Sequence, residues 1–194
     1  METKVYYAST DSIDKNLDAY INMLPDNLKG RIQKISDLNA KVCSLGGALL
    51  LDIAAKEFGE DISKVVYNPK GKPYIPESDF YFSISHTDGY AAISFGKTPS
   101  GCDIQIKKDV NFKIAQRFFS EKEYASISDS DDFFKIWCRK ESAYKISGVN
   151  YCTELNEQRY VFSDHRLKDD LYMCVCTTNG KMHTPELIDF NTVL

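Results

Sequence analysis

Helical and strand patterns fall into separate blocks along this chain of 194 residues, and their order restricts the folds that it can adopt. After one short opening strand, helical periodicity covers 12–58, and strand-like runs then fill 65–106. Helical patterns return over 111–147, and further strand-like runs follow them. A doubly wound parallel sheet needs a helix between successive strands, and this alternation is missing from the sequence. The sequence therefore predicts an α+β fold.

The predicted strands are short runs rich in Val, Ile, Tyr and Phe that end at Gly, Pro or polar residues. They cover 5–8, 65–68, 72–75, 80–85, 90–95, 101–106, 159–162 and 171–176. The predicted helices cover 12–24, 37–58, 111–118, a segment that begins at a Ser120–Glu123 capping box, and 131–147. Ser36 is the predicted cap of the long second helix, and Gly148 is the predicted stop of the last one.

A pair of glycines, Gly46-Gly47, interrupts the long second helix. Each glycine costs about 1 kcal/mol relative to alanine inside a helix, so we expect close packing against another backbone there. The halves 1–100 and 101–194 share a loose helix-then-sheet plan, and no low-complexity linker divides them. We therefore expect one compact unit with an N-terminal lobe, 1–100, and a C-terminal lobe, 101–194.

Composition argues against several classes of protein. The net charge of −4 gives no global basic field for nucleic acid or a membrane surface, although a local basic pocket remains compatible with it. The start METKVYYASTDS lacks the pattern of a signal peptide, and the apolar run around 45–55 is expected to be too short and polar to span a bilayer. The six cysteines show no CxxC pair or zinc spacing, which favours buried reduced thiols over a disulfide set. We expect a cytoplasmic monomer.

Three side chains of the last predicted helix recur at four-residue intervals: Trp137, Glu141 and Lys145. Four residues are slightly more than one helical turn, so these side chains share a face. If that face is exposed, Glu141 and Lys145 form an ordinary surface ion pair worth on the order of a few tenths of a kcal/mol. If the face lines a cleft, Trp137 anchors the helix while the acid and the lysine contact a charged ligand.

The predicted strand GCDIQI, 101–106, carries two polar side chains on one face. Asp103 and Gln105 point to the same side, about 7 Å apart, whereas Ile104 points to the core side. Together with Glu141 from a facing helix, these two oxygen ligands are suited to a hard cation such as Mg²⁺. The alternative is a half-exposed edge strand with two solvated polar residues.

Further polar residues lie at predicted turns and on the second helix. Ser85 and His86 end a strand where backbone and side chains converge easily on anions. Lys72 and Pro73 belong to a rigid GKP turn, and Lys41 adds a cation on the long helix. Each of these residues is, in isolation, more typical of a turn, a structural hydrogen bond or a solvated surface.

Taken in order, these segments resemble one known family. The motifs are GKP at 71–73, SISH at 83–86, GCDIQ at 101–105, FFS-x-x-E at 118–123 and W-x-x-KES-x-x-K at 137–145. Their order and intervals are similar to those of the surfactin-type 4'-phosphopantetheinyl transferases. The resemblance runs from about residue 31 to 148 and is fainter at both ends.

The resemblance implies a 4'-phosphopantetheinyl transferase fold, in which two pseudo-twofold-related lobes hold coenzyme A in the cleft between them. It also implies Mg²⁺-dependent transfer of the phosphopantetheine arm to a serine of an acyl, polyketide or peptidyl carrier protein, with release of adenosine 3',5'-bisphosphate. The implied metal ligands are Asp103, Gln105 and Glu141, and the implied catalytic residues are Glu141, Lys145 and Asp103. The implied coenzyme A contacts are Lys41, Lys72, Pro73, Ser85, His86, Lys140 and Lys145, with Arg31 aligned less securely.

One position departs from the family pattern, because Gln105 stands where the family usually has a third acid. An amide oxygen can ligate a hard cation but brings no charge. Two alternatives therefore stay open beside the transferase: a degenerate relative that binds coenzyme A or a carrier protein without turnover, and another Mg²⁺-dependent enzyme that processes nucleotides. The sequence leaves the natural acceptor open.

Overall fold

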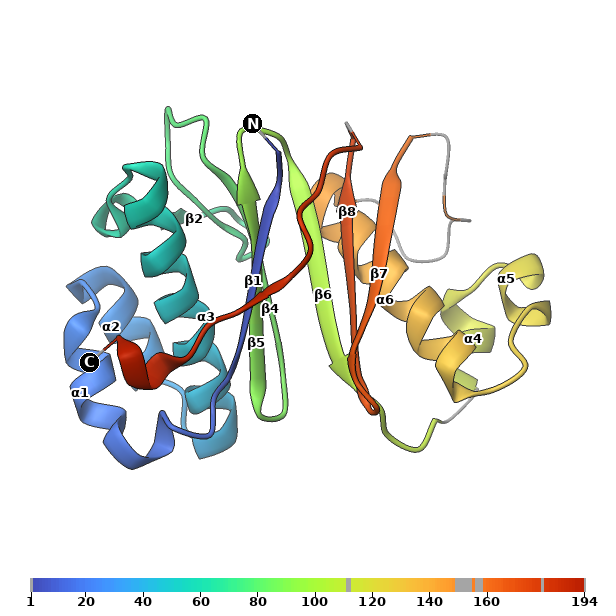
Figure 1. The fold of residues 1–194 in the computed structure, drawn as a ribbon, viewed down its shortest axis with the longest axis horizontal. Coiled ribbons are helices and arrows are strands. Elements are labelled where there is room, and N and C mark those ends of the chain that lie inside the picture. The colour runs from blue at the N-terminus through green and yellow to red at the C-terminus, as the bar shows by residue number, and fades with distance from the viewer. Residues whose placement is uncertain (1, 111–112, 149–154, 156–158, 179, 194) are drawn as a thin grey trace.

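The structure is a computed structural model, and it describes residues 2–110, 113–148, 155, 159–178, 180–193. Two β-sheets stand side by side in the middle of the molecule, and helices cover their outer sides (Figure 1). The first sheet has the order β4-β5-β1-β9, and the second has the order β6-β8-β7. Segregated helices and mainly antiparallel sheets confirm the predicted α+β class.

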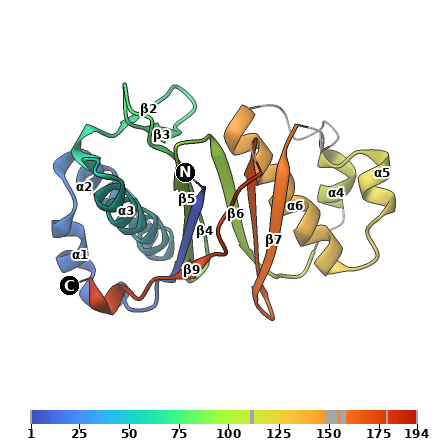
Figure 2. The same ribbon diagram turned by 45° about the horizontal axis from the view of Figure 1, so that its top comes forward.

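The elements of the first sheet and its helices come mainly from the first hundred residues. The strands are β1 Lys4–Ser9, β4 Tyr81–Thr87, β5 Tyr90–Gly96 and β9 Glu186–Leu187. The helical segments are η1 Asp14–Asn16, α1 Leu17–Met23, α2 Asp26–Gln33, α3 Leu38–Phe58 and η2 Ile62–Lys64. A separate hairpin, β2 Val66–Tyr67 and β3 Pro73–Tyr74, projects beside this sheet (Figure 2).

Helix α3 packs closely on the first sheet because of its two central glycines. A Cβ atom on Gly46 would lie 2.7 Å from Cγ2 of Thr10, and one on Gly47 would lie 2.8 Å from Cγ2 of Ile84. The prediction of close packing is confirmed, although the neighbouring atoms belong to side chains rather than to another backbone. The helix can therefore lie against β4 without a Cβ between them.

By length and composition, α3 is apolar enough to cross a membrane, since its mean hydropathy reaches 1.4 over 18 residues. The expectation that its apolar run is too short was wrong, because the helix continues for 21 residues through Leu38–Phe58. Within the protein, 61% of that window is buried. Leu45 and Leu49 are in the core of the first sheet, so packing accounts for the hydropathy, which makes it weak evidence for a membrane span.

The second sheet consists of β6 Ser100–Ile106, β7 Val161–Lys168 and β8 Leu171–Thr177. Its helices are α4 Lys113–Phe118, α5 Glu121–Ala125 and α6 Ser130–Ser147. Helix α6 lies directly on β6 and β8, where Ser142 Oγ donates a hydrogen bond to the Cys174 carbonyl at 2.9 Å. A Cβ atom on Gly101 would lie only 2.0 Å from the Ser142 carbonyl oxygen. Only glycine at this position lets α6 approach the strand so closely.

The two sheets meet where β4 runs beside β6, and side-chain hydroxyls replace a backbone ladder along this seam. The side-chain hydroxyl of every second residue of β4 accepts a hydrogen bond from the backbone N–H of every second residue of β6, at 3.2 or 3.3 Å. The pairs are Ser83 with Cys102, Ser85 with Ile104, and Thr87 with Ile106. The edge of β6 therefore has its donors satisfied within the protein, which removes the usual liability of an open edge.

The C-terminal segment returns from the second sheet to the first and crosses in front of β1 (Figure 1, red). Thr3 exchanges backbone hydrogen bonds with Lys181 and His183, and β9 then pairs with β1 in parallel. The 3-10 segment η3 Phe190–Thr192 buries Phe190, whose carbonyl accepts from the Tyr20 hydroxyl at 2.9 Å. Residues from the end of the chain thus complete the first core.

The predicted elements are present with several differences. The helix predicted for 12–24 divides into η1 and α1, and Asp37 rather than Ser36 caps α3 by accepting from the Ala40 N–H at 2.8 Å. The Ser120–Glu123 capping box and the left-handed Gly148 stop are confirmed. Helix α2 and strand β9 were not predicted. The part of the 111–118 helix at 111–112 lies outside the described residues.

The contact at Gly101 predicts a large effect of a single methyl group. Gly101→Ala should lower the free energy of unfolding by about 3 kcal/mol or more, because the added carbon overlaps a backbone oxygen that cannot move without shifting α6. Gly30→Ala is the matched control, since Gly30 lies in α2 and no atom comes within 4 Å of the place that a Cβ would take. The control should stabilise the protein by about 0.5–1 kcal/mol. Urea unfolding midpoints test both, and equal midpoints for the two variants would contradict the close contact.

Candidate functional site

Asp103 is the centre of the site, and it is buried, with 2% of its surface exposed. One carboxylate oxygen, Oδ1, accepts from Ser85 Oγ at 2.7 Å and from Lys145 Nζ at 2.8 Å. The other, Oδ2, accepts from the amide nitrogen of Gln105 at 3.0 Å. Asp103 and Gln105 therefore share a side of β6, as the strand pattern predicted. The alternative of a half-exposed edge strand is wrong for Asp103, because β4 and α6 both pack against β6.

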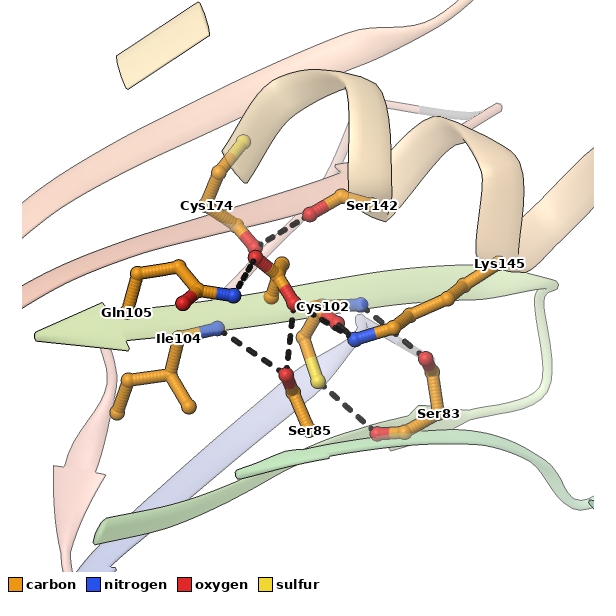
Figure 3. A network of polar contacts seen from close by, with 9 residues as sticks. Ser83, Ser85, Cys102, Ile104, Gln105, Ser142, Lys145 and Cys174 are labelled. Carbon is orange, nitrogen blue, oxygen red and sulfur yellow. Dashed lines mark hydrogen bonds and ion pairs between the residues drawn. The ribbon is translucent and has the colours of Figure 1, made fainter. Parts of the chain in front are cut away.

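Lys145 connects this buried carboxylate with the surface. Its ammonium group donates to Asp103 at 2.8 Å. It also donates, at 2.8 Å, to the Cys102 carbonyl (Figure 3). Burial is the largest single influence and would lower the pKa of Lys145, but the charge and hydrogen bond of Asp103, together with Cys102 and the charge of Glu141, outweigh it, and the pKa is raised. The side chain keeps 22% of its surface exposed. A permanent cation thus stands between Asp103 and the adjoining cavity.

That cavity, which we call the lysine cavity, has a volume of about 480 Å³ and lies between the β2–β3 hairpin, β4 and the end of α6. Three lysines line its wall: Lys70, Lys72 and Lys145. Lys72 Nζ donates to the Lys145 carbonyl at 2.5 Å, and burial together with the charge of Lys145 lowers the pKa of Lys72. The hairpin lysine therefore caps the negative C-terminal end of α6, where cations are favoured.

A second cavity of about 490 Å³, the arginine cavity, opens on the other side of the hairpin between α2, α3 and β4. Its basic lining consists of Arg31, Lys34 and His86, and the Arg31 guanidinium lies 3.7 Å from the centre of the Tyr67 ring. Pro73 and Ile84 line both cavities, so the two adjoin. Arg31 aligned less securely than the other residues with the coenzyme A contacts of the family, and in the structure it lines the arginine cavity.

Ser85 and His86 face different surroundings because successive strand residues point to opposite sides. Ser85 is buried against Asp103, whereas the His86 side chain is exposed at the arginine cavity. Neighbouring protein removes much of the water from the His86 ring, and this desolvation, followed by the charge of Lys145, lowers its pKa. His86 is therefore a largely neutral ring at pH 7 that an anion could recharge.

The remaining predicted site residues are Glu141 and Lys140 on α6 and Lys41 on α3. Glu141 is half-buried one turn before Lys145, and its charge helps to raise the pKa of Lys145. Buried Lys140 forms an ion pair with half-buried Glu123 at 2.7 Å, so its charge is neutralised inside the C-terminal half. Lys41 lies on α3 one turn before Ser44, which lines the arginine cavity, but the described lining does not include Lys41.

Two residues belong to the site that the sequence reasoning did not place there. Cys138 lies on α6 one turn before Glu141, and burial together with the charge of Asp103 raises the pKa of its thiol well above its usual range. Lys70, at the tip of the hairpin, reaches the Gly148 carbonyl at 3.5 Å. The helical spacing of Cys138 relative to Glu141 was the available signal; nothing in the sequence marks Lys70.

The residues named as metal ligands do not form a Mg²⁺ site as they stand. Both oxygens of Asp103 already accept hydrogen bonds, and Gln105 presents its nitrogen rather than its oxygen to that carboxylate. Within the described part of the chain, no group of three or more His, Cys, Asp or Glu residues is placed to hold a metal ion. The five cysteines that the structure describes are buried and unpaired, as expected for reduced thiols.

Comparisons with known proteins show which family the chain resembles. Residues 99–177 match the model of the 4'-phosphopantetheinyl transferase superfamily, and the resemblance predicted from the ordered motifs is thereby confirmed. Over these residues the chain is similar to this superfamily, and it is similar to surfactin-type members at moderate identity.

Three curated relatives carry the name of this enzyme class. A 4'-phosphopantetheinyl transferase of Bacillus subtilis is 33% identical over 150 residues, which cover 73% of this chain and 64% of the relative. The transferase Sfp of Bacillus subtilis strain 168 is 33% identical over 54% of this chain and 50% of its own length. The transferase gsp of Aneurinibacillus migulanus is 35% identical over 46% and 40%. The chain thus spans between 40% and 64% of the length of these relatives.

The lowered pKa of His86 predicts how stability depends on pH. Below the ordinary histidine value the unfolded chain takes up a proton that folded His86 resists, so the free energy of unfolding should fall as the pH drops below about 6.5. His86→Gln should reduce that fall, leaving the part due to His165, whose pKa burial also lowers. His183→Gln, at a histidine with 49% of its side chain exposed, is the matched control for the loss of a histidine. Urea unfolding between about pH 5 and pH 7.5 measures the slopes, and a wild-type slope for His86→Gln would refute the assignment.

Proposed function

We propose that the protein transfers the 4'-phosphopantetheine arm of coenzyme A to a serine hydroxyl of an acyl, polyketide or peptidyl carrier protein. The observation that carries the proposal is the position of Lys145, whose ammonium group touches buried Asp103 and also lines a cavity with two further lysines. Coenzyme A is a polyphosphate, and adjoining cavities with six basic side chains in their walls suit such a ligand. The superfamily match and the named relatives support this substrate class.

The proposed reaction is a phosphoryl transfer between two oxygen atoms. The serine oxygen attacks the phosphorus that carries the pantetheine arm, a new P–O bond forms, and the bond to the bridging oxygen of the pyrophosphate breaks. Adenosine 3',5'-bisphosphate leaves with that electron pair, and the serine proton passes to a base. Positioning and charge stabilisation account for most catalysis of this kind.

In this reaction Lys145 and Lys72 stabilise the negative charge that grows on the pyrophosphate. Glu141 is the proposed base, because it is half-buried on the same face of α6 as Lys145. Arg31 and His86 are proposed to hold the more distant phosphate of coenzyme A in the arginine cavity. Ser85 and Lys140, both predicted as contacts, act indirectly in this proposal, since each is engaged with a carboxylate of the protein itself.

The pseudo-twofold relation of the lobes, the Mg²⁺ requirement, the cytoplasmic location and the monomeric state stay predictions. Mg²⁺ dependence is tested by the same assay with and without EDTA. The saturated surroundings of Asp103 favour one second candidate, a relative that binds coenzyme A without turnover.

Intact-mass spectrometry distinguishes the two candidates. Apo forms of an acyl, a polyketide and a peptidyl carrier protein are incubated with coenzyme A, MgCl₂ and the protein. Transfer adds the mass of one phosphopantetheine to a carrier. Binding of coenzyme A with no mass gain on any of the three carriers would support the non-catalytic candidate, and absence of both would reject the family function.

Replacing Glu141 tests its role as base. Glu141→Gln keeps the shape of the side chain but cannot accept the serine proton, so the transfer rate should fall by about 10²–10⁴-fold. The dissociation constant of coenzyme A should stay near the wild-type value. Rates come from the intact-mass assay, and binding comes from calorimetry. Turnover within a few fold of wild type would remove Glu141 from the reaction.

Replacing Lys72 tests the lysine cavity. Lys72→Ala removes one charge-assisted contact to a phosphate, so the dissociation constant of coenzyme A should rise by about 10-fold or more. Lys135→Ala is the matched control, because Lys135 is an exposed lysine on α6 outside both cavities. Calorimetric titration with coenzyme A compares the two variants. Equal affinities would show that the ligand does not occupy the lysine cavity.

A further inference from the structure

We propose that Gln105 is a positioning residue which, together with Lys145, holds Asp103 in place of a divalent cation, so that the free protein takes up no Mg²⁺ at this carboxylate. The inference deepens the proposed function, since it concerns the same site and rests on that assignment for its relevance to catalysis. Its test measures folding stability and needs no transfer activity.

The orientation of the Gln105 amide is the first step. A carboxylate only accepts hydrogen bonds, so the side chain that touches Asp103 Oδ2 at 3.0 Å must present its nitrogen. A cation at the same place would need the amide oxygen instead. Gln105 cannot donate to Asp103 and ligate a cation at the same place unless its amide group rotates. In the observed arrangement Gln105 therefore acts as a hydrogen-bond donor and not as a ligand.

The two ions in direct contact, Asp103 and Lys145, balance each other in charge. The carboxylate carries one negative charge, and Lys145 supplies one positive charge at 2.8 Å, while Gln105 and Ser85 contribute neutral donors. Such saturation is what keeps a buried carboxylate from being costly. A divalent cation on Asp103 would displace Lys145 and repel its ammonium group. Lys145 lines the lysine cavity, where an anionic ligand would receive its ammonium group.

A glutamate at position 105 would reverse this balance. Gln105→Glu removes a donor and places a second carboxylate beside buried Asp103, with one lysine for two negative charges. Like charges at this distance destabilise the folded protein. A divalent cation would bridge them and relieve the repulsion, and a ligand that binds the folded state alone raises stability. One substitution should therefore make folding stability depend on Mg²⁺.

The experiment measures thermal unfolding midpoints of the full chain in EDTA, in MgCl₂, and in KCl of equal ionic strength, without coenzyme A. Gln116→Glu is the control, because Gln116 is exposed on α4 and the substitution makes the same change in net charge. Wild type and the control should give equal midpoints in MgCl₂ and KCl. Gln105→Glu should unfold about 5 °C below wild type in EDTA and recover in MgCl₂ but not in KCl.

Two outcomes would overturn the inference. One is a wild-type midpoint that rises in MgCl₂ above its value in KCl, and the other is a Gln105→Glu midpoint that matches wild type in EDTA or is not restored by MgCl₂. If Gln105→Glu does not fold, equilibrium dialysis of the free wild-type protein against Mn²⁺ replaces the unfolding experiment. Stoichiometric uptake of Mn²⁺ that is lost in Asp103→Asn would contradict the proposal. No uptake of Mn²⁺ would support it. A failed transfer assay would reject the proposed function and leave these results unchanged.

Discussion

The ion pair between Lys145 and Asp103 is the interaction on which the arrangement of this protein depends. Two buried ions seldom stabilise a fold by themselves, because the loss of hydration outweighs their attraction unless their other hydrogen-bonding positions are filled. Here they are filled by groups from two strands: Ser85 of β4, and Gln105 and the Cys102 carbonyl of β6. Each of these strands, and α6, must place its polar atoms within hydrogen-bond distance of the ion pair. The pair therefore fixes α6 and both sheets relative to one another.

Two local features make this convergence possible. Gly101 brings the backbone of α6 down onto β6, so that the Lys145 side chain reaches a carboxylate on the strand beneath it. Along the seam, the hydroxyl of Ser85 accepts from the Ile104 N–H and donates to Asp103, and in this way joins sheet packing to the charged site. Packing and function thus use the same atoms. A change that loosens the seam should also displace the carboxylate.

The sequence predicted most elements and the side of β6 on which Asp103 lies, because strand alternation and helix caps are local effects. It did not predict α2, since Gly30 and the charged residues of that segment give a weak helical pattern. It also missed β9, a strand of two residues that pairs with β1, which lies far away in the sequence. The burial of Asp103 and the partner of Lys140 depend on tertiary contacts, which no local pattern encodes.

The net charge of the chain is negative, yet the two cavities are basic, and this contrast follows from how the acids are used. Asp103 and Glu123 are each engaged by a lysine inside the C-terminal half, so neither presents its charge to a ligand. The lysines and the arginine in the cavity walls are placed by short segments, namely the β2–β3 hairpin, α2 and the last turn of α6. Within a cavity walled by protein, such cations act more strongly than they would in water. An acidic protein can therefore attract a polyphosphate at one place on its surface, and the position of Lys145 ties that attraction to the buried carboxylate behind it.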